Sequence, residues 1–385
     1  MKLALIVPGG VDRGGTQRVV PFLLWLLERL AREHDVHVFA LRQEARPGRW
    51  RLLGADVHNV GARPRRLRAL AALAREHAKA PFDVLHAHWA VPQGVVGAVA
   101  RRLLRRPLVL GLAGGELVSL PGADFGGMRH VTGRAWVRLS MAAADRVVVP
   151  NDAMAEEARR LGHRAIVVPL GVALDAWPAL APRRRPPGST ARLLHVADLR
   201  PVKDQDTLLR AAALLRAWGV DFTLDVAGGD TMGGRVQRRA AELDLEDRVR
   251  FHGAVPHASL RPLVDASHVL VVTSLFEAGP VAMLEAAVAG VPTVGTAVGY
   301  VRAWAPAAAA AVPVGDAEAL AAALRRHLED EEGRVALARA AHRRALAYDA
   351  DAMAAGYEAI YRELRGRRAP RATVRAAHAG RAVGR

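Results

Sequence analysis

The stretch LVVTSLFEAGPVAMLEAAVAGVPTV, residues 270–294, contains the signals that decide how this chain folds. It begins with a short apolar run rich in Val, which is typical of a buried parallel strand. A polar turn follows, and Gly279 and Pro280 mark the start of a helix, because proline suits a first helical position. A second apolar run then begins at Pro292. The order strand, helix, strand predicts a parallel sheet covered by helices.

The same alternation extends outward from this stretch in both directions. In the second half of the chain we expect strands at Arg192–Ala197, Phe222–Ala227, Val249–Gly253, Val269–Thr273 and Pro292–Gly295. In the first half we expect strands at Leu3–Val7, Asp35–Leu41, Asp56–Val60, Val84–Ala87, Leu108–Leu112, Arg146–Val149 and Ala165–Val168, with helices that include Thr16–Arg32 and Arg65–Ala80. The sequence therefore predicts an α/β fold with two doubly wound domains.

Domain boundaries follow from changes in composition. Residues 179–190 are polar, rich in proline and without periodicity, so we interpret them as a linker between a first domain, residues 1–178, and a second domain, residues 191–364. After Asp316 the chain is nearly all helical. These terminal helices are candidates for packing against the first domain. The tail, residues 365–385, has seven Arg and no acidic residue, and we expect it to be disordered.

Composition excludes several classes of protein. The 385 residues are 51% hydrophobic and 24% charged, which fits two packed domains rather than a disordered chain. No cysteine is present, which excludes disulfides, thiolate nucleophiles and zinc fingers, and which fits a cytoplasmic location. The apolar run Val19–Leu27 is far shorter than the about 20 residues that a membrane span needs, and it contains Pro21. We expect no transmembrane helix.

The net charge of +17 is compatible with three kinds of anionic partner: nucleic acid, an anionic membrane surface or a phosphorylated ligand. Only three of the 55 basic residues are lysines, namely Lys2, Lys79 and Lys203. We attribute the excess of arginine to a GC-rich genome rather than to a polyanion, and we expect no nucleic-acid partner. A lysine that persists in this background is a candidate for a chemical role.

Ligands of open α/β sheets bind beyond the carboxyl ends of strands, so the loops after strands are the places to search. The loop PGGVDRGGTQR, residues 8–18, carries Gly14 and Gly15 just before the expected helix at Thr16. Glycines there let backbone N–H groups approach a phosphate at a helix N-terminus. A tight structural turn explains a double glycine equally well, and the pattern matches neither common phosphate-loop motif.

The loop in HVADLRPVKDQDTLL, residues 195–209, places Lys203 after a strand with Arg200 beside it. A compact cation there would neutralise a leaving diphosphate, and Arg200 is able to bind phosphate oxygens in bidentate fashion. The alternative is a solvated lysine at a helix start. We favour the phosphate role, because the helix dipole opposes a cation in the first turn.

The third loop lies within residues 270–294, between the apolar strand and the helix that follows it. Glu277 follows the apolar strand, and Glu285 lies eight positions later inside the helix. The N–H groups at Val281 favour an anion, and Glu285 is placed to accept hydrogen bonds from ribose hydroxyls. The alternatives are that Glu277 is only a partner of the helix dipole and that Glu285 is a solvated glutamate. The neighbours of Glu285 are apolar, which weakens the second alternative.

The segment Glu277–Glu285 resembles the E-x7-E signature of retaining, nucleotide-sugar-dependent glycosyltransferases of family 4, which have the two-domain GT-B fold. Nearly the whole chain to about residue 364 follows that family's pattern in order. The segments that carry the resemblance are the Gly14-Gly15 loop, DVLHAHW (83–89), VPLGVALDAWP (168–178), VADLRPVKDQDTLLRA (196–211), DVAGGD (225–230) and RVRFHGAVP (248–256).

The resemblance implies a role for each of these positions. Arg200 and Lys203 meet the diphosphate, Glu285 the ribose, and Val255 lines the base pocket, while Glu277 lies near the transferred sugar. Gly14, Gly15, Gly229, Gly279, Pro280 and Val281 complete the donor-binding set. The family's usual mechanism is front-face displacement across a central cleft, in which the leaving diphosphate takes the acceptor proton and no protein nucleophile is required.

Three positions depart from the family pattern. The usual His-Gly-x-Asp motif is replaced by Ala113, Gly114, Gly115 and Glu116, so the histidine is absent while Glu116 keeps an acid. Asp198 occupies the usual phosphate-binding arginine position, and the common acid after Gly299 is not evident. Among the histidines, His86 and His88 at a strand end are candidates for acceptor contact or base, with a structural role as the alternative.

We expect no metal and no cofactor, because the only Asp-x-Asp match near these loops, Asp204 and Asp206, is better explained as helix capping and dipole partners. The expected activity is transfer of a sugar from a nucleotide sugar to a glycan, a lipid-linked glycan or a small metabolite. The alternatives are an epimerase or phosphorylase on the same fold, and a catalytically silent nucleotide-sugar-binding protein.

Two arginine clusters in the first domain suggest contact with the inner, anionic face of a membrane, with solvated helix faces as the equal alternative. They are Arg65, Arg66 and Arg68, and Arg101, Arg102, Arg105 and Arg106.

Overall fold

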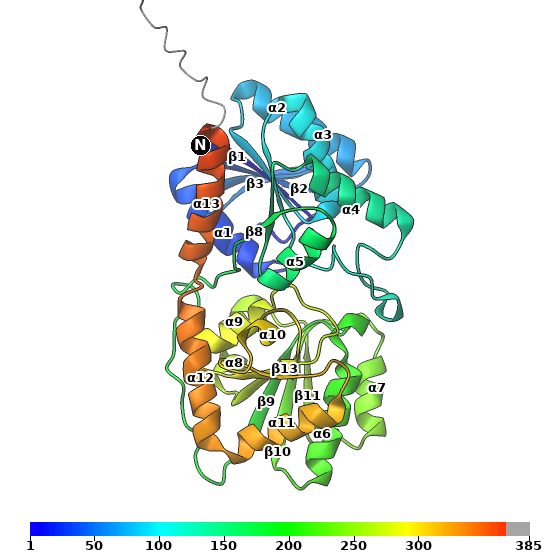
Figure 1. The fold of residues 1–385 in the computed structure, drawn as a ribbon, viewed down its shortest axis with the longest axis vertical. Coiled ribbons are helices and arrows are strands. Elements are labelled where there is room, and N and C mark those ends of the chain that lie inside the picture. Colours follow the sequence, from blue (N-terminus) through cyan, green and yellow to red (C-terminus); the bar gives the residue numbers. More distant parts are fainter. Residues whose placement is uncertain (367–385) are drawn as a thin grey trace, which may run out of the picture.

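The computed structural model describes residues 1–366 and forms two parallel sheets, each in its own domain (Figure 1). The first sheet has eight strands in the order β3-β4-β2-β1-β5-β6-β7-β8, and the second has six in the order β11-β10-β9-β12-β13-β14. Every pairing is parallel except that of β3 with β4. The prediction of two doubly wound α/β domains is therefore confirmed.

Most strands are apolar runs of the sequence, and the inner strands of each sheet are buried on both faces as parallel sheets require, whereas the edge strands are only partly buried. In the first sheet they are β1 (Lys2–Val7), β2 (Asp35–Ala40), β3 (Gly48–Leu52), β4 (Ala55–Asn59), β5 (Val84–His88), β6 (Leu108–Gly111), β7 (Arg146–Val149) and β8 (Ala165–Val167). In the second they are β9 (Ala191–Val196), β10 (Phe222–Ala227), β11 (Val249–Gly253), β12 (Val269–Val272), β13 (Thr293–Thr296) and β14 (Ala310–Val312).

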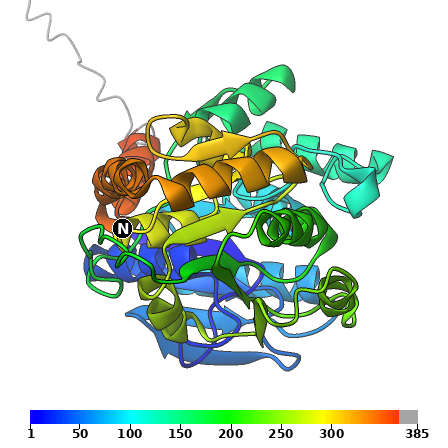
Figure 2. The ribbon, with the colours of Figure 1, turned by 90° about the horizontal axis from the view of Figure 1, so that it is seen from below.

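Helices connect the strands and cover both faces of each sheet, as the view from below shows for the second domain (Figure 2). In the first domain they are α1 (Pro21–Glu33), α2 (Arg65–Lys79), α3 (Val95–Leu104), α4 (Val131–Ala143) and α5 (Asp152–Arg160). The second domain has α6 (Gln205–Ala217), α7 (Arg235–Glu242), α8 (Arg261–Asp265), α9 (Val281–Val288), α10 (Gly299–Trp304), α11 (Ala317–Glu329) and α12 (Glu331–Leu346), and α13 (Ala350–Gly366) ends the described chain.

Three elements differ from the sequence prediction. Strands β3 and β14 were not expected, because β3 (GRWRL) alternates arginine with other residues at a sheet edge and β14 is a three-residue run rich in alanine. The helix expected from Thr16 begins instead at Pro21. The Asp12 carboxylate accepts the N–H groups of Thr16 (2.9 Å) and Gln17 (3.3 Å), which holds these residues in a turn before the helix.

The last helix of the chain, α13, lies against the first domain, while α12 lies along the second (Figure 1). The Tyr361 hydroxyl is 2.6 Å from Nδ1 of His86 on β5, and Glu363 pairs with Arg146. At the start of α13, the N–H of Ala350 donates to the carbonyl of Val172 at 2.9 Å. The chain therefore crosses between the domains twice, and the two crossings are hydrogen-bonded to each other. The expected basic tail lies outside the described residues from residue 367 onward.

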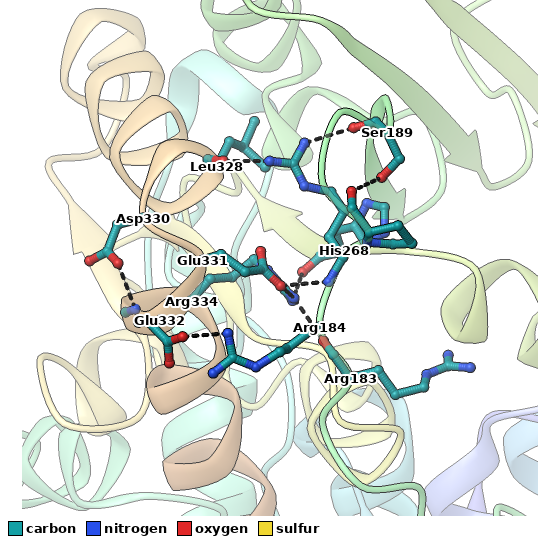
Figure 3. A network of polar contacts seen from close by, with 12 residues as sticks. Arg183, Arg184, Ser189, His268, Leu328, Asp330, Glu331, Glu332 and Arg334 are labelled. Atoms are coloured by element: carbon teal, nitrogen blue, oxygen red, sulfur yellow. Dashed lines mark hydrogen bonds and ion pairs between the residues drawn. The ribbon is translucent and has the colours of Figure 1, made fainter.

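The segment interpreted as a linker is fixed to α12 by a buried arginine (Figure 3). Arg334 is 2% exposed, and its guanidinium donates to the carbonyls of Arg183 (2.8 Å) and His268 (3.1 Å) and to the Glu331 carboxylate (2.5 Å). Glu331 in turn accepts the N–H of Arg185 at 2.6 Å. Each polar group of this network has a partner, so the linker is held as part of the second domain.

We predict that Arg334→Met lowers the free energy of unfolding by about 3 kcal/mol, because two carbonyls and a carboxylate lose their partner in a buried place. Arg339→Met, on an exposed face of the same helix, is the matched control and is expected to stay within about 0.5 kcal/mol of the wild type. Urea unfolding followed by circular dichroism measures both. Equal midpoints for the two variants would contradict the role given to Arg334.

Candidate active site

A lysine and a glutamate meet at the carboxyl ends of two neighbouring strands of the second sheet. Lys203 follows β9 in a short helical turn, Pro201–Lys203, and Glu277 follows β12. The Lys203 Nζ is 2.5 Å from Oε1 of Glu277, and the Ser274 hydroxyl donates to the same oxygen at 2.6 Å. The side chains are 24% and 14% exposed, so the pair is accessible and yet fixed in place.

Two buried residues beneath this pair were not singled out from the sequence. His195 is 2% exposed, its Nδ1 is 3.0 Å from the carbonyl of Val271, and its Nε2 is 3.3 Å from the Gln205 amide nitrogen. Burial lowers the pKa of His195 to about 4, so the ring stays neutral below Lys203. A histidine at the end of an apolar strand was the available signal. The neutral ring supports the loop without adding a second cation.

The Glu277 loop depends on glycines that permit close contact. A Cβ at Gly279 would lie 2.8 Å from the ring of Tyr300, and Gly299 has a φ of +47° beside Glu277. Pro280 occupies the N-cap, so α9 begins at Val281, one residue later than the sequence indicated. Gly279, Pro280 and Val281 thus lie beside Glu277, as the prediction placed them.

The same loop is docked on the first domain. The Asn151 amide donates to the carbonyl of Ala278, and Ala278 is part of the apolar core of the first domain. The Tyr300 hydroxyl donates to the carbonyl of Pro150 at 3.2 Å and accepts the N–H of Leu170 at 2.8 Å. Asn151 and Tyr300 were missed in the sequence because their role exists only between domains.

Glu285 is not brought together with Lys203 and Glu277. Its side chain is 5% exposed, and its carboxylate oxygen is 2.5 Å from Nε2 of His257. The His257 ring stacks on Trp177 and meets the edge of Trp25 from the first domain, with ring centres 5.3 and 5.7 Å away. Contact between Glu285 and a ribose stays a prediction. In this structure the Glu285 carboxylate is bonded to His257 instead.

The remaining donor-binding candidates occupy separate places. Gly229 donates its N–H to the Asp198 carboxylate at 2.9 Å, and Val255 is partly buried two residues before His257. Arg200 is exposed and lines a cavity of about 620 Å³ between α6 and α7, with no ion-pair partner in residues 1–366. Asp204 accepts from Thr207 as the cap of α6, which confirms the capping interpretation.

The interpretation of Gly14 and Gly15 as a phosphate loop at a helix N-terminus is wrong in its geometry. Gly15 donates its N–H to the carbonyl of Asp12 at 3.1 Å, and α1 begins six residues later at Pro21. The Asp12 turn therefore separates the glycines from the helix dipole. The earlier pair, Gly9 and Gly10, lines a cavity instead, and the double glycine in PGG was the signal for it.

That cavity, called here the first-domain cavity, has a volume of about 650 Å³ and opens at the carboxyl end of the first sheet. Glu116 lines it and is 8% exposed; one carboxylate oxygen accepts the N–H of Gly114 at 2.9 Å, and the other has no partner among the described residues. Burial raises the pKa of Glu116 to about 7. Trp89 forms part of the wall with a φ of +70°, a conformation that a bulky residue rarely adopts.

His88 lies behind this cavity rather than in it. It is fully buried, with its ring centre 4.0 Å from that of His86 and 6.0 Å from that of Tyr357 on α13. Neither ring nitrogen has a hydrogen-bond partner in the described part of the chain, and burial lowers the pKa of His88 to about 3. The structure does not bring His88 near Glu277, and a catalytic role for it stays a prediction.

The first-domain cavity adjoins the Glu277 loop. Phe125 forms one wall of the cavity, and its ring centre is 6.1 Å from that of Phe276, the residue before Glu277. Gly115 has room for no side chain, because a Cβ there would lie 2.2 Å from Phe125. The Phe125–Phe276 contact therefore places one wall of the cavity against the Glu277 loop.

Comparison with known proteins agrees with this arrangement. Residues 180–344 match the family model described as glycosyl transferases group 1, and residues 14–171 match the glycosyl transferase 4-like domain. The D-inositol 3-phosphate glycosyltransferases of Kineococcus radiotolerans and Thermomonospora curvata are each 30% identical to this chain, over 93% of this chain and 92% of the relative in the first case and 77% of each in the second.

Solved structures share the fold. Sucrose-phosphate synthase of Thermosynechococcus elongatus superposes with a TM-score of 0.83 at 21% identity, over 95% of this chain and 100% of that one. Anabaena HepE in complex with UDP-glucose superposes with a TM-score of 0.74 at 20% identity, over 94% and 99%. The fold is thus that of a GT-B transferase. The chain belongs to the GT4-type glycosyltransferases.

We predict a pH-dependent stability that comes from Glu116. Its pKa is raised from 4.5 to about 7 in the folded chain, so between these pH values the folded state binds more protons than the unfolded state. Stability is therefore lost as pH rises from about 4.5 to about 7. Glu116→Gln is expected to remove that loss, which is on the order of 2 to 3 kcal/mol.

Urea unfolding of wild type and Glu116→Gln at pH 5 and pH 8 measures this effect, with the exposed Glu246→Gln as control. Parallel pH profiles for wild type and Glu116→Gln would show that the buried carboxyl ionises without penalty.

Proposed function

We propose that this glycosyltransferase moves a sugar from a nucleoside-diphosphate sugar to an acceptor hydroxyl with retention of configuration. The observation that carries the proposal is the Lys203–Glu277 pair, which stands at the ends of neighbouring strands and beside the start of α9. A diphosphate at this place gains a lysine as partner and the N–H groups of a helix N-terminus, while Glu277 is left to bind sugar hydroxyls.

In the proposed reaction the bond between the sugar and the diphosphate breaks as the acceptor oxygen bonds to the same face of the sugar. The acceptor proton passes to the departing phosphate oxygen. Lys203 exchanges Glu277 for that phosphate and neutralises its growing charge. No residue of the chain becomes covalently attached, so positioning by the two domains supplies the remaining catalysis.

We propose that the reaction needs no metal ion. Three groups of His, Asp and Glu lie close enough together to hold one in residues 1–366, and none of them includes Lys203, Glu277 or a neighbour of these residues. Turnover is then expected to persist in EDTA.

Two other functions remain to be separated from transfer by experiment. An epimerase or phosphorylase would alter or cleave the donor without an acceptor, and a silent binding protein would leave it intact in every mixture. Product analysis of a nucleotide sugar with and without acceptors decides among them. Transfer requires that a new glycoside form only when an acceptor is present.

The acceptor classes suggested by the sequence are a glycan, a lipid-linked glycan and a small metabolite. The relatives named above act, by their names, on D-inositol 3-phosphate. Their similarity over most of both chains favours a small hydroxylated acceptor, and it leaves the donor base and sugar to be found by a screen of nucleotide sugars.

We further propose that the first domain touches an anionic membrane surface. No helix in the described residues is long and apolar enough to cross a bilayer. On the neighbouring helices α2, α3 and α4, however, large apolar side chains are exposed. Five arginines from α3, the segment after it and β7 line a cavity of about 370 Å³, and two of them, Arg101 and Arg146, are in ion pairs. The exposed residues are Leu67 (67%), Leu103 (65%), Val131 (72%), Leu139 (47%) and Trp136 (39%). Apolar and basic side chains together suit the headgroup region.

The first prediction for this function concerns the diphosphate. Lys203→Ala is expected to lower kcat/KM at least about tenfold, roughly 1.4 kcal/mol, because the leaving group loses its cation. Lys203→Arg should recover only part of the rate, since the Glu277 oxygen that Lys203 contacts also accepts from Ser274, and a broad planar guanidinium fits this place less well than a compact ammonium. Kinetics at limiting and saturating donor measure both. Wild-type values for both variants would place the diphosphate elsewhere.

The second prediction concerns the membrane. The protein should cosediment with vesicles containing anionic lipid but not with neutral vesicles, and added salt should weaken binding. Arg102→Gln with Arg105→Gln is expected to reduce binding, whereas Arg339→Gln with Arg343→Gln on α12 serves as the control of equal charge. Equal partitioning of the wild type into both kinds of vesicle would exclude an electrostatic contact.

A further inference from the structure

Two histidines and a glutamate form a polar cluster inside the first domain, between the first sheet and α2. His37 on β2, His58 on β4 and Glu76 on α2 are 7%, 5% and 4% exposed. Their candidate ligand atoms all lie within 4.8 Å of one another. A buried glutamate is rare unless it is paired, and three polar side chains from three separate elements meet here in an otherwise apolar layer.

Aromatic packing fixes the two histidine rings. His58 stacks on Phe39 with ring centres 4.8 Å apart, and His37 meets Phe82 edge to face at 5.6 Å. Nδ1 of His37 is 3.0 Å from Nε2 of His58. Two nitrogen ligands of a tetrahedral zinc ion, each about 2.0 to 2.1 Å from the metal, lie about 3.3 Å from each other. The two rings therefore already have nearly the separation that one zinc ion requires.

The proton positions also suit a metal ion. Nε2 of His37 is 3.2 Å from a carboxylate oxygen of Asp35, which places the ring proton there and directs the lone pair of Nδ1 at His58. Histidines that bind metals commonly donate their other ring N–H to a carboxylate in this way. Nδ1 of His58 is buried and has no partner among the described residues. When a metal replaces the proton that the two rings share, that proton moves to Nδ1 of His58.

The third ligand is a carboxylate that two surface cations contact in this structure. Oε1 of Glu76 is 2.9 Å from the Arg49 guanidinium and 3.0 Å from Nζ of Lys79. The side chains of Arg49 and Lys79 are 52% and 57% exposed, so both are able to turn into solvent. Ion pairs made by such exposed side chains contribute little to stability. A metal ion that takes the Glu76 carboxylate therefore displaces weak partners.

The donor set selects the class of metal. Two imidazoles with one carboxylate are a set that binds zinc, whereas Mg²⁺ and Ca²⁺ prefer oxygen ligands. Two other groups in residues 1–366 have ligand atoms at similar spacing, and each has a single histidine and at least one exposed carboxylate. These groups are Glu33, His34 and Glu358, and Asp35, His37 and Asp56.

We propose that His37, His58 and Glu76 form a zinc site that joins α2 to β2 and β4. The metal stabilises the first domain, because it links a helix and two strands through side chains that lie far apart in the sequence. Lys203 and Glu277 follow strands of the second sheet, so this site takes no part in the proposed sugar transfer. The inference is independent of that function and is tested without it.

Metal binding to the full chain tests the proposal. The protein is stripped of metal with dipicolinate, dialysed, and titrated with Zn²⁺, Mg²⁺ or Ca²⁺ in a calorimeter. We expect one equivalent of Zn²⁺ to bind at micromolar concentration and to raise the melting temperature, while Mg²⁺ and Ca²⁺ leave it unchanged. Failure to bind an equivalent of Zn²⁺, or an equal effect of Mg²⁺, overturns the inference.

Variants locate the metal among the three groups. His58→Gln and Glu76→Gln should each weaken Zn²⁺ binding at least about tenfold. His34→Gln and Asp56→Asn remove one ligand from each of the other two groups, and both are expected to keep the wild-type affinity. Loss of binding in either control, or wild-type affinity in His58→Gln, overturns the assignment. Circular dichroism of each metal-free variant verifies that it is folded.

His58→Cys tests the same position by a gain of signal rather than a loss of binding. A thiolate is a ligand for Zn²⁺ and Co²⁺, and the chain has no cysteine of its own. A thiolate-to-cobalt charge-transfer absorption can therefore arise only at position 58. We expect this band in His58→Cys at one equivalent of Co²⁺ and not in the wild type. Its absence from the folded variant would show that residue 58 does not contact the metal.

Discussion

The docking of the Glu277 loop between the two domains is the constraint on which the site depends. Asn151 holds the carbonyl of Ala278, and Tyr300 bonds to Pro150 and Leu170, so the loop after β12 is fixed from the first domain. Because the chain crosses between domains twice and α13 packs on the first sheet, this interface is tied together by the covalent chain as well. These contacts therefore fix the position of the Lys203–Glu277 pair.

Cations line both cavities, while burial shifts two titratable groups beside them toward their neutral forms. Burial keeps His195 uncharged beneath Lys203, and it raises the pKa of Glu116 to about 7 beside a cavity lined by arginine. A deep anion near these cations would compete with phosphate, and a second deep cation would add desolvation cost without contacting a ligand. The neutral His195 therefore leaves Lys203 as the cation available to the proposed diphosphate.

Prediction from sequence succeeded where a local pattern is sufficient. The apolar runs marked most of the strands, because burial on both faces demands continuous Val, Ile and Leu. It failed where partners decide the structure. Strand β14 is a short alanine run that becomes a strand only through pairing with β13, and α1 begins late because the Asp12 carboxylate captures N–H groups that a helix would leave free. For the same reason Gly14 and Gly15 do not lie at a helix N-terminus as expected.

The sequence by itself determined the two-domain α/β fold and the membership in the glycosyltransferase family, and it predicted that Lys203 and Glu277 lie at one edge of a sheet, since the ends of parallel strands meet there. Only the tertiary structure decided that these two side chains pair, that His257 holds Glu285, and that His88 is sealed behind the cavity wall. Those outcomes depend on side chains distant in the chain, whose meeting follows from packing that no local pattern of residues records.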